Sequence, residues 1–158
     1  MVIKKKVLVL FGAAFLALAA LANAPAATQV QRETSLLAAV NAARAAHGLK
    51  PLVNDAALTR AARGHSATML RTKVFAHGDF GARIRAVGAT GPFFGENLGW
   101  GVGTRASARE IVRMWLRSPG HRANLLRPGF RRVGLGAPAG PFAGYSRAVV
   151  VTANFAGR

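Results

Sequence analysis

The sequence has no cysteine, only five acidic residues, two tryptophans and one tyrosine among its 158 residues. Without a thiol there is no disulfide framework, no cysteine-ligated zinc, no thiol nucleophile and no lipid-modified cysteine. The length suits one domain with one hydrophobic core. A composition that is 51% hydrophobic and 17% charged excludes a disordered polyelectrolyte. We therefore expect one folded domain that its own core stabilises.

The chain has one long apolar run, and it lies at the N-terminus. Three lysines at positions 4–6 precede the uncharged run 7–22, and Ala22-Asn23-Ala24 has the pattern of a cleavage site. The run is shorter than the ~20 residues that a membrane-spanning helix needs. We predict a signal peptide over residues 1–24, with an uncleaved N-terminal anchor as the alternative. The rest of the chain is then secreted: extracellular, periplasmic or associated with the cell wall.

Negative charge is scarce, since 22 Lys+Arg face 5 Asp+Glu and the net charge is +17. Removal of the three leader lysines lowers the net charge to +14. Such a surface attracts envelope polyanions or acidic lipids. The alternative is that the arginine-rich composition only keeps the protein soluble. No stripe of alternating basic and aromatic residues and no nucleic-acid motif occurs in the sequence. We expect an envelope polyanion or a small polar ligand as partner, no transmembrane segment after signal cleavage, and a monomer.

Hydrophobic periodicity predicts helices first and a β-hairpin last. Residues 25–33 are expected to form a short linker, and residues 34–158 the domain. The expected elements are helices over about 34–47, 55–72 and 107–118, a helical turn over 81–87, and strands over 132–137 and 147–155. Residues 75–106 are glycine-rich without periodicity, and Gly134 and Gly136 indicate a close approach to a strand. This order favours an α+β fold with helices against an antiparallel sheet.

Four polar residues lie in apolar or glycine-rich contexts near the ends of expected elements: His77, Glu96, Glu110 and His121. Two imidazoles and one carboxylate suit a divalent cation such as zinc, and the second carboxylate would serve as fourth ligand or base. Without metal, Glu96 or Glu110 would be the candidate general base, beside an oriented histidine. Simpler roles remain open: Glu110 as the N3 acid of a capping box, Glu96 as an arginine-paired loop anchor, and histidines bonded to backbone.

Two other histidines have structural interpretations. His65 shares a helical stripe with Leu58, Ala61 and Met69, which predicts a hydrogen-bonded core histidine. His47 precedes Gly48 at the end of the first helix, where a histidine compensates the helix dipole.

Taken together, these segments resemble the CAP superfamily (cysteine-rich secretory proteins, antigen 5, pathogenesis-related 1), in its bacterial, cysteine-free branch. The resemblance extends from about Ser35 to Phe155. The matching segments are Leu37-x-x-Val40-Asn41-x-x-Arg44-x-x-x-Gly48-Leu49-x-Pro51-Leu52, Leu58-x-x-Ala61-Ala62-x-x-His65-Ser66-x-x-Met69, Phe75-x-His77, Gly95-Glu96-Asn97-Leu98, Trp115-x-x-Ser118-Pro119-Gly120-His121-Arg122-x-Asn124-Leu125-Leu126 and Phe130-x-x-Val133-Gly134-x-Gly136.

The resemblance implies a three-layer α-β-α sandwich with a small antiparallel sheet and a cleft lined by His77, Glu96, Glu110 and His121. Some members of the family hold zinc or another divalent cation there. The eukaryotic disulfides are absent, which weakens any transfer of lipid binding from those relatives. The leading hypothesis is an extracellular binding module at the cell envelope, whose cleft holds a divalent cation or a small polar ligand. The alternatives are a metal-dependent hydrolase of peptide or cell-wall substrates in the same cleft, and a structural domain with a remnant site.

Overall fold

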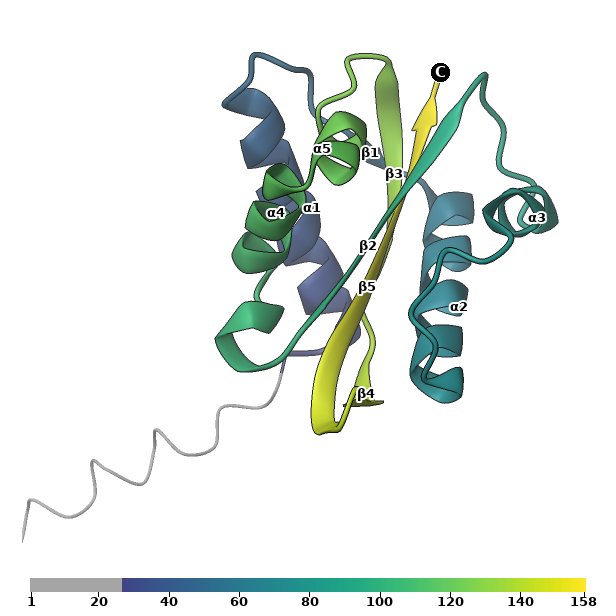
Figure 1. Ribbon diagram of the computed structural model, residues 1–158. Helices are drawn as coiled ribbons and strands as arrows, with labels where there is room; N and C mark the ends of the chain where they lie inside the picture. The colour runs from purple at the N-terminus through teal and green to yellow at the C-terminus, as the bar shows by residue number, and fades with distance from the viewer. Residues whose placement is uncertain (1–26) are drawn as a thin grey trace, which may run out of the picture.

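A five-stranded sheet forms the middle layer of the molecule (Figure 1). The computed structural model describes residues 27–158, so the predicted signal peptide over 1–24 lies outside the described residues. The strands are β1 (Val53–Asn54), β2 (Phe94–Gly101), β3 (Phe130–Gly136), β4 (Ala139–Phe142) and β5 (Tyr145–Gly157). Their order is β1-β3-β5-β2, and β4 pairs with β5. All pairings are antiparallel except that of the short β1 with β3.

Helices cover both faces of the sheet. They are α1 (Gln29–Ala45), α2 (Ala56–Thr72), α3 (Phe80–Ala86), α4 (Ala108–Arg117) and α5 (Pro119–Leu125), with a 3₁₀ turn, η1, over Gly103–Ala106. Figure 1 shows α1, α4 and α5 on one side of the sheet and α2 and α3 on the other. The expected three-layer α-β-α sandwich is thereby confirmed. Within residues 27–158, each helix falls short of the length and hydropathy needed to cross a membrane.

The first helix begins earlier than the periodicity predicts. Thr28 caps it: its hydroxyl accepts from the Gln31 backbone N–H, and the Gln31 side chain accepts from the Thr28 N–H at 2.7 Å. This reciprocal capping box starts the helix at Gln29, so residues 29–33, expected in the linker, are helical. The predictions for α2, α3, α4, β3 and β5 agree with the structure to within a few residues, whereas β1, β2, β4 and α5 were not predicted.

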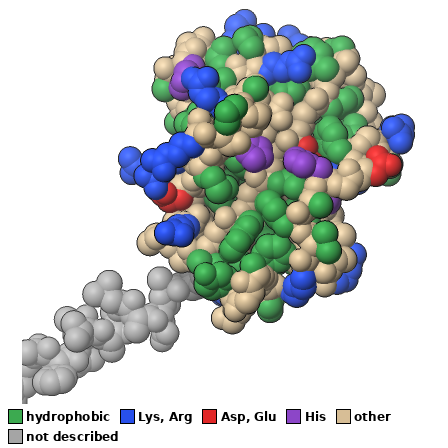
Figure 2. Space-filling model, in the orientation of Figure 1, with side chains coloured by type: hydrophobic (Ala, Val, Ile, Leu, Met, Phe, Trp, Pro, Cys, Tyr) green, Lys and Arg blue, Asp and Glu red, His purple; other side chains and the backbone are tan. Residues whose placement is uncertain are grey.

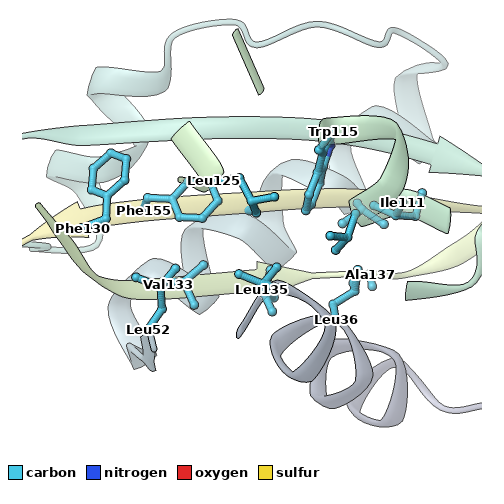
Figure 3. Packing of buried hydrophobic residues seen from close by; sticks show 14 of the residues in the cluster. Leu36, Leu52, Ile111, Trp115, Leu125, Phe130, Val133, Leu135, Ala137 and Phe155 are labelled. Atoms are coloured by element: carbon cyan, nitrogen blue, oxygen red, sulfur yellow. The ribbon is translucent and has the colours of Figure 1, made fainter. Parts of the chain in front are cut away.

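The main hydrophobic core lies between the sheet and the layer of α1, α4 and α5. Trp115 of α4 is fully buried at its centre and donates its indole N–H to the Leu98 carbonyl of β2 at 2.7 Å. Phe130 stacks on Phe155 there, with ring centroids 5.4 Å apart. Figure 3 shows the labelled side chains of this core, from Phe130 at one end of the sheet to Leu36 at the other. This core fixes α4 and α5 against β2.

Helix α2 packs unusually close to β3 on the opposite face. A Cβ atom on Gly134 would lie 2.0 Å from the Leu58 carbonyl carbon, and one on Gly136 would lie 2.5 Å from that of Ala62. Any larger residue would therefore push helix and strand apart. The prediction that the two glycines mark a close approach is confirmed.

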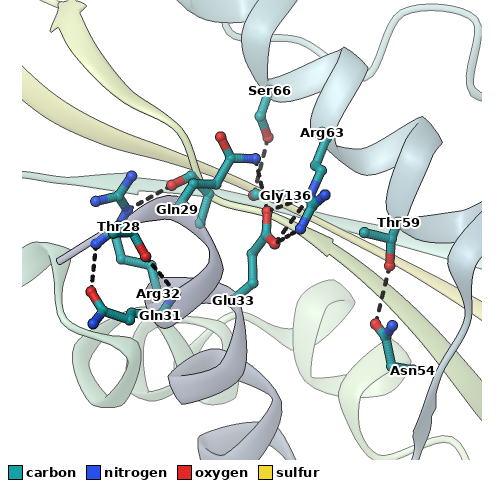
Figure 4. A network of polar contacts seen from close by, with 11 residues as sticks. Thr28, Gln29, Gln31, Arg32, Glu33, Asn54, Thr59, Arg63, Ser66 and Gly136 are labelled. Atoms are coloured by element: carbon teal, nitrogen blue, oxygen red, sulfur yellow. Dashed lines mark hydrogen bonds and ion pairs between the residues drawn. The ribbon is translucent and has the colours of Figure 1, made fainter.

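An ion pair joins the two outer layers near β3. Glu33 of α1 accepts from Arg63 Nε of α2 at 3.0 Å and from Gln29 Nε2 at 2.8 Å, and Figure 4 shows the pair close to Gly136. Ser66 of α2 donates to the Gly136 carbonyl at 3.3 Å. These contacts hold α1 and α2 in place from opposite faces of the sheet.

Candidate binding groove

Glu96 of β2 is a buried carboxylate whose two oxygens are bound from several directions. Its side chain is 3% exposed; Oε1 accepts from His77 Nδ1 at 2.8 Å and Oε2 from Arg83 Nη2 at 2.7 Å. Asn154 lies opposite in β5, and with its amide oriented to pair both polar atoms it donates to Oε2 at 3.1 Å while accepting from the Ala62 N–H. Glu96 is therefore held in place by its partners. Its ion pair with Arg83 agrees with the interpretation of Glu96 as an arginine-paired anchor, although Glu96 lies in a strand and not in a loop.

His77 is the exposed partner of this anchor. It lies in the segment between α2 and α3, and its side chain is 56% exposed. Because Nδ1 is bonded to Glu96, Nε2 is the ring nitrogen left for a ligand.

His121 lies in the first turn of α5, which two asparagines attach to β2. Asn97 donates to the His121 carbonyl at 2.9 Å, and Asn124 donates to the Glu96 carbonyl at 3.1 Å and to Asn97 Oδ1 at 3.0 Å. Within residues 27–158, the buried Nδ1 of His121 has no hydrogen-bond partner. Burial lowers the pKa of His121, and the nearby His77 lowers it further. His121 is therefore a neutral imidazole at neutral pH, close to His77.

Glu110 lies on α4 and forms an ion pair with Arg113 one turn further along the helix. Its backbone N–H donates to the Ser107 hydroxyl at 3.4 Å, as a capping box requires. The Glu110 carboxylate bonds to Arg113 and makes no return bond to the Ser107 N–H, so only half of the expected capping box forms.

A groove of about 570 Å³ is lined by the edge strand β2, by α4 and η1, and by side chains from α5, β5 and the segment after α2. We call it the aromatic groove; it is lined by Phe75, Leu98, Gly99, Trp100, Gly101, Val102, Arg105, Glu110, Arg113, Met114, Arg117, His121 and Tyr145. Six large hydrophobic side chains are exposed in the described part of the chain, and three of them, Phe75, Met114 and Tyr145, lie in this groove. Figure 2 shows histidine side chains near the middle of this face, beside a band of hydrophobic ones. Contiguous exposed apolar side chains are typical of interaction surfaces.

Part of the groove is lined by a row of aromatic rings. Phe75, Phe142, Trp100 and Tyr145 follow one another with centroid separations of 6.2, 5.6 and 6.2 Å. Phe142 is buried and supports the other three, which line the groove. The row is thus a continuous apolar surface within the groove.

The structure brings the four predicted site residues to one face in two pairs. His77 and Glu96 are bonded to each other beside the groove, while Glu110 and His121 line it. No three His, Asp or Glu side chains in residues 27–158 are grouped so that they could hold a metal ion. Cation binding by this set therefore stays a prediction.

The two structural histidines have the contacts that the sequence predicts. His65 is 7% exposed and its Nε2 bonds to the Ala76 carbonyl at 3.0 Å. Burial lowers the pKa of His65, and Arg83 lowers it further. The exposed His47 bonds through Nδ1 to the Ala43 carbonyl at 2.8 Å, at the C-terminal end of α1. Both predictions are confirmed.

Several residues of the site were not identified from the sequence. Arg83 and Asn154 fix Glu96, and Asn97 and Asn124 fix α5, but each acts through a partner far along the chain. Asn97 and Asn124 do lie in the motifs that carry the family resemblance, which was the available signal for them. The aromatic row has no local signal, because its rings come from four separate segments.

Comparison with known proteins agrees with this fold. An extracellular protein containing an SCP domain from Bacillus anthracis str. Ames superposes with a TM-score of 0.69 at 24% identity, over 86% of this chain and 45% of that one. An outer surface protein from Borrelia burgdorferi gives a TM-score of 0.63 at 19% identity, over 78% of this chain and 90% of that one. The fold therefore places the molecule in the class of α-β-α sandwich domains to which the SCP domain belongs.

Sequence comparison identifies the family. The family described as "CAP: Cysteine-rich secretory protein family" matches residues 37–155. The uncharacterized protein YkwD of Bacillus subtilis (strain 168) is 34% identical over 109 residues, which are 66% of this chain and 41% of that protein. This chain belongs to the CAP family, as the resemblance in its motifs implies. It spans less than half the length of its two Bacillus relatives.

Proposed function

We propose that this chain is an exported binding module whose aromatic groove takes a small polar ligand of the cell envelope. The observation that carries the proposal is the gathering of exposed Phe75, Met114 and Tyr145 beside the polar side chains of Glu110 and His121. Ligand sites are typically concave and mostly apolar, with a few polar groups that orient the ligand.

Export is supported by the predicted leader and by the proteins that share the fold. Two structural neighbours are described as an extracellular protein and an outer surface protein. The large excess of basic residues suits a location among anionic envelope polymers.

The polar side chains suit recognition of a ligand that carries hydroxyl or carboxyl groups. His77 offers Nε2 to solvent, because Glu96 holds its Nδ1. His121 is neutral and close by, so the pair can both donate and accept hydrogen bonds. The groove's polar rim is thus pre-organised by the bonds from Glu96, Asn97 and Asn124.

A divalent cation, zinc first, is the second ligand class, and His77 and His121 would hold it. Both carboxylates are already engaged, Glu96 by Arg83 and Glu110 by Arg113, so neither completes a ligand shell without losing an ion pair. We therefore rank the small polar ligand first. Calorimetry with zinc chloride on wild type and a His77→Ala, His121→Ala variant tests the cation. Binding lost in the variant supports it, and equal binding by both proteins excludes this site.

Sedimentation with isolated cell-wall sacculi tests the binding module. We expect wild type to co-sediment and a Phe75→Ala, Tyr145→Ala variant to remain largely in the supernatant. The matched control is Val30→Ala, Val53→Ala, which truncates two apolar side chains that are also exposed but lie outside the groove. Co-sedimentation that is equal for all three folded proteins would contradict a role for the groove.

The alternative function is a metal-dependent hydrolase of peptide or cell-wall substrates in the same groove. The hydrogen bond of buried Glu96 to exposed His77 favours it, because a carboxylate behind an imidazole orients a general base. Release of soluble fragments from peptidoglycan or casein, measured with added zinc, tests this function. Release that disappears in Glu96→Gln supports it, whereas no release by wild type, or release retained in a Glu96→Gln, Glu110→Gln variant, excludes it.

A further inference from the structure

We propose that the aromatic groove binds a linear acidic polysaccharide, with its sugar rings on the aromatic row and its carboxylates facing the arginines of α4 and η1. The inference rests on the proposed function, because it names the class of ligand for the same groove. It is drawn from two groups of lining residues of different chemistry, aromatic rings and arginines, that share one groove of about 570 Å³.

The aromatic wall offers apolar contact to a ligand that is otherwise polar. Phe75 is 42% exposed and Tyr145 51% exposed, and Trp100 lies between them in the row. The C–H faces of a pyranose ring are apolar, and its hydroxyls project from the rim. A sugar ring can therefore cover an aromatic face while its hydroxyls stay in water or reach the His121 side chain.

The part of the lining that α4 and η1 contribute carries three positive charges, those of Arg105, Arg113 and Arg117. Arg113 and Arg117 are one helical turn apart, a rise of about 6 Å, which is comparable with the length of one sugar unit. Arg105 of η1 lines the same groove. The side chains of Arg105 and Arg117 form no hydrogen bond or ion pair with any other residue in 27–158, whereas Arg113 is paired with Glu110. Figure 2 shows basic side chains along the edge of this face where α4 lies.

Charge favours an anionic ligand in this groove. Glu110 is the only acidic residue in the lining, against three arginines. A guanidinium pairs with a carboxylate through two parallel hydrogen bonds, so a carboxylate on each sugar unit matches the spacing of the arginines. The sequence contains no local stripe of basic and aromatic residues. Instead, the fold brings such residues together from α4, η1, β2, β5 and the segment after α2.

The inclination of the rings favours a polysaccharide over a single-stranded nucleic acid. Trp100 and Tyr145, which both line the groove, meet at 47°, and the buried Phe142 beneath the row meets Phe75 at 63° and Trp100 at 69°. Bases stack on aromatic side chains through their flat faces, so inclined rings turn successive bases out of parallel. Sugar rings turn with respect to one another along a chain, so they can follow platforms that are inclined.

The test measures Kd by calorimetry for octagalacturonate, which carries one carboxylate per sugar, and for maltooctaose, a neutral chain of the same length. We expect octagalacturonate to bind and maltooctaose to bind at least about tenfold more weakly. An Arg113→Gln, Arg117→Gln variant should lose about tenfold in affinity for octagalacturonate. The control Lys50→Gln, Arg85→Gln removes the same charge outside the groove and should stay within about twofold of wild type.

A Tyr145→Ala variant separates groove binding from general attraction to a basic protein. It keeps every charge, so weaker binding of octagalacturonate by this variant places the sugar chain on the aromatic row. Equal losses in the two charge variants, no effect of Tyr145→Ala, or tighter binding of an octathymidylate than of octagalacturonate would each overturn the inference. If sacculi still require Phe75 and Tyr145 while octagalacturonate does not bind, the binding module stands and only the ligand class is wrong.

Discussion

At the scale of single residues, Arg44 shows how this fold uses a cation with no acid beside it. Its side chain is fully buried, and its guanidinium donates to the backbone carbonyls of Lys50, Leu125, Arg127 and Phe130 at 2.9 to 3.3 Å. The carbonyls belong to the loop after α1 and to the turn that leads from α5 to β3. Arg44 thus fixes the C-terminal end of the helix that carries His121.

Replacement of Arg44 by methionine should destabilise the protein by about 3 kcal/mol or more, because it leaves several buried carbonyls without a donor. Urea unfolding measures the change. Arg85→Met, at an exposed position on α3, should stay within about 0.5 kcal/mol of wild type. An Arg44→Met variant within about 1 kcal/mol of wild type would contradict the role given to these four bonds.

His65 predicts how stability depends on pH. Burial and Arg83 lower its pKa below the ordinary value of about 6.5, so the unfolded chain binds its proton more readily than the folded protein does. The stabilising contribution is then complete above about pH 6.5 and is lost as the pH falls from there toward the lower pKa of the folded state. The free energy of unfolding, measured by urea titration between pH 7.5 and 5, should fall in this range.

His65→Gln should make this fall shallower, since one of the groups that gains a proton on unfolding is removed. His121, whose pKa is also lowered, accounts for part of the remaining slope. His47→Gln changes an exposed histidine and is the control. A slope that His65→Gln leaves unchanged would show that His65 is not the group that titrates.

At the scale of the elements, the β4–β5 hairpin has a turn whose backbone conformation suits its sequence poorly. Phe142 pairs with Tyr145, so the loop consists of Ala143 and Gly144, both with positive φ, at 50° and 84°. A two-residue turn of this kind is typical of Asn-Gly, and alanine in the left-handed region is unfavourable by about 1 kcal/mol. The hairpin matters for function because it presents Tyr145 to the aromatic groove.

Ala143→Asn should therefore raise the free energy of unfolding by about 0.5 to 1 kcal/mol, because asparagine adopts this conformation more readily. Thermal or urea unfolding measures the gain. Ala46→Asn replaces an exposed alanine at the right-handed C-cap of α1 and should give no comparable gain. A destabilised Ala143→Asn protein would mean that the turn tolerates alanine for another reason.

The elements that the sequence predicts are those whose signal is local. Helices α2 and α4 have a polar cap followed by a periodic apolar face, and β5 has a run of β-branched residues. Strand β2 escapes prediction because Phe94–Gly101 contains three glycines and no alternation; eight pairings with β5 make it a strand. Helix α5 begins at Pro119. From the sequence, this proline indicates only the end of α4, although proline is also common at the first position of a helix.

The residues of the site also divide into those with a local sequence signal and those without one. His77, Glu96, Glu110 and His121 can be picked out because each is a polar residue in an apolar or glycine-rich segment. Arg83 cannot, since one arginine among many has no distinguishing context, and its role depends on a carboxylate 13 positions away on another element. The engagement of both carboxylates by arginines, which weighs against a ready-made cation site, is likewise a property of the folded chain alone.

At the scale of the whole molecule, every acidic residue is committed to a specific structural bond. Four form ion pairs with arginine, Glu33, Asp55, Glu96 and Glu110, and Asp79 caps α3 by accepting from the Ala82 N–H at 2.8 Å. None is left to balance the remaining cations, so the surface of the domain is dominated by unneutralised positive charge. Repulsion within this surface opposes the compact state.

Added salt should therefore stabilise this protein, although it also weakens surface ion pairs. Each such pair contributes about 0–1 kcal/mol, whereas the excess of cations acts over the whole surface. We expect the free energy of unfolding to rise by on the order of 1 kcal/mol between 20 and 300 mM sodium chloride, because the shorter Debye length screens the repulsion between the cations. Urea titrations at each salt concentration measure it. An Arg85→Glu, Arg109→Glu variant, which lowers the net charge by four, should show a smaller rise. A decrease in stability with salt would mean that the ion pairs outweigh the repulsion.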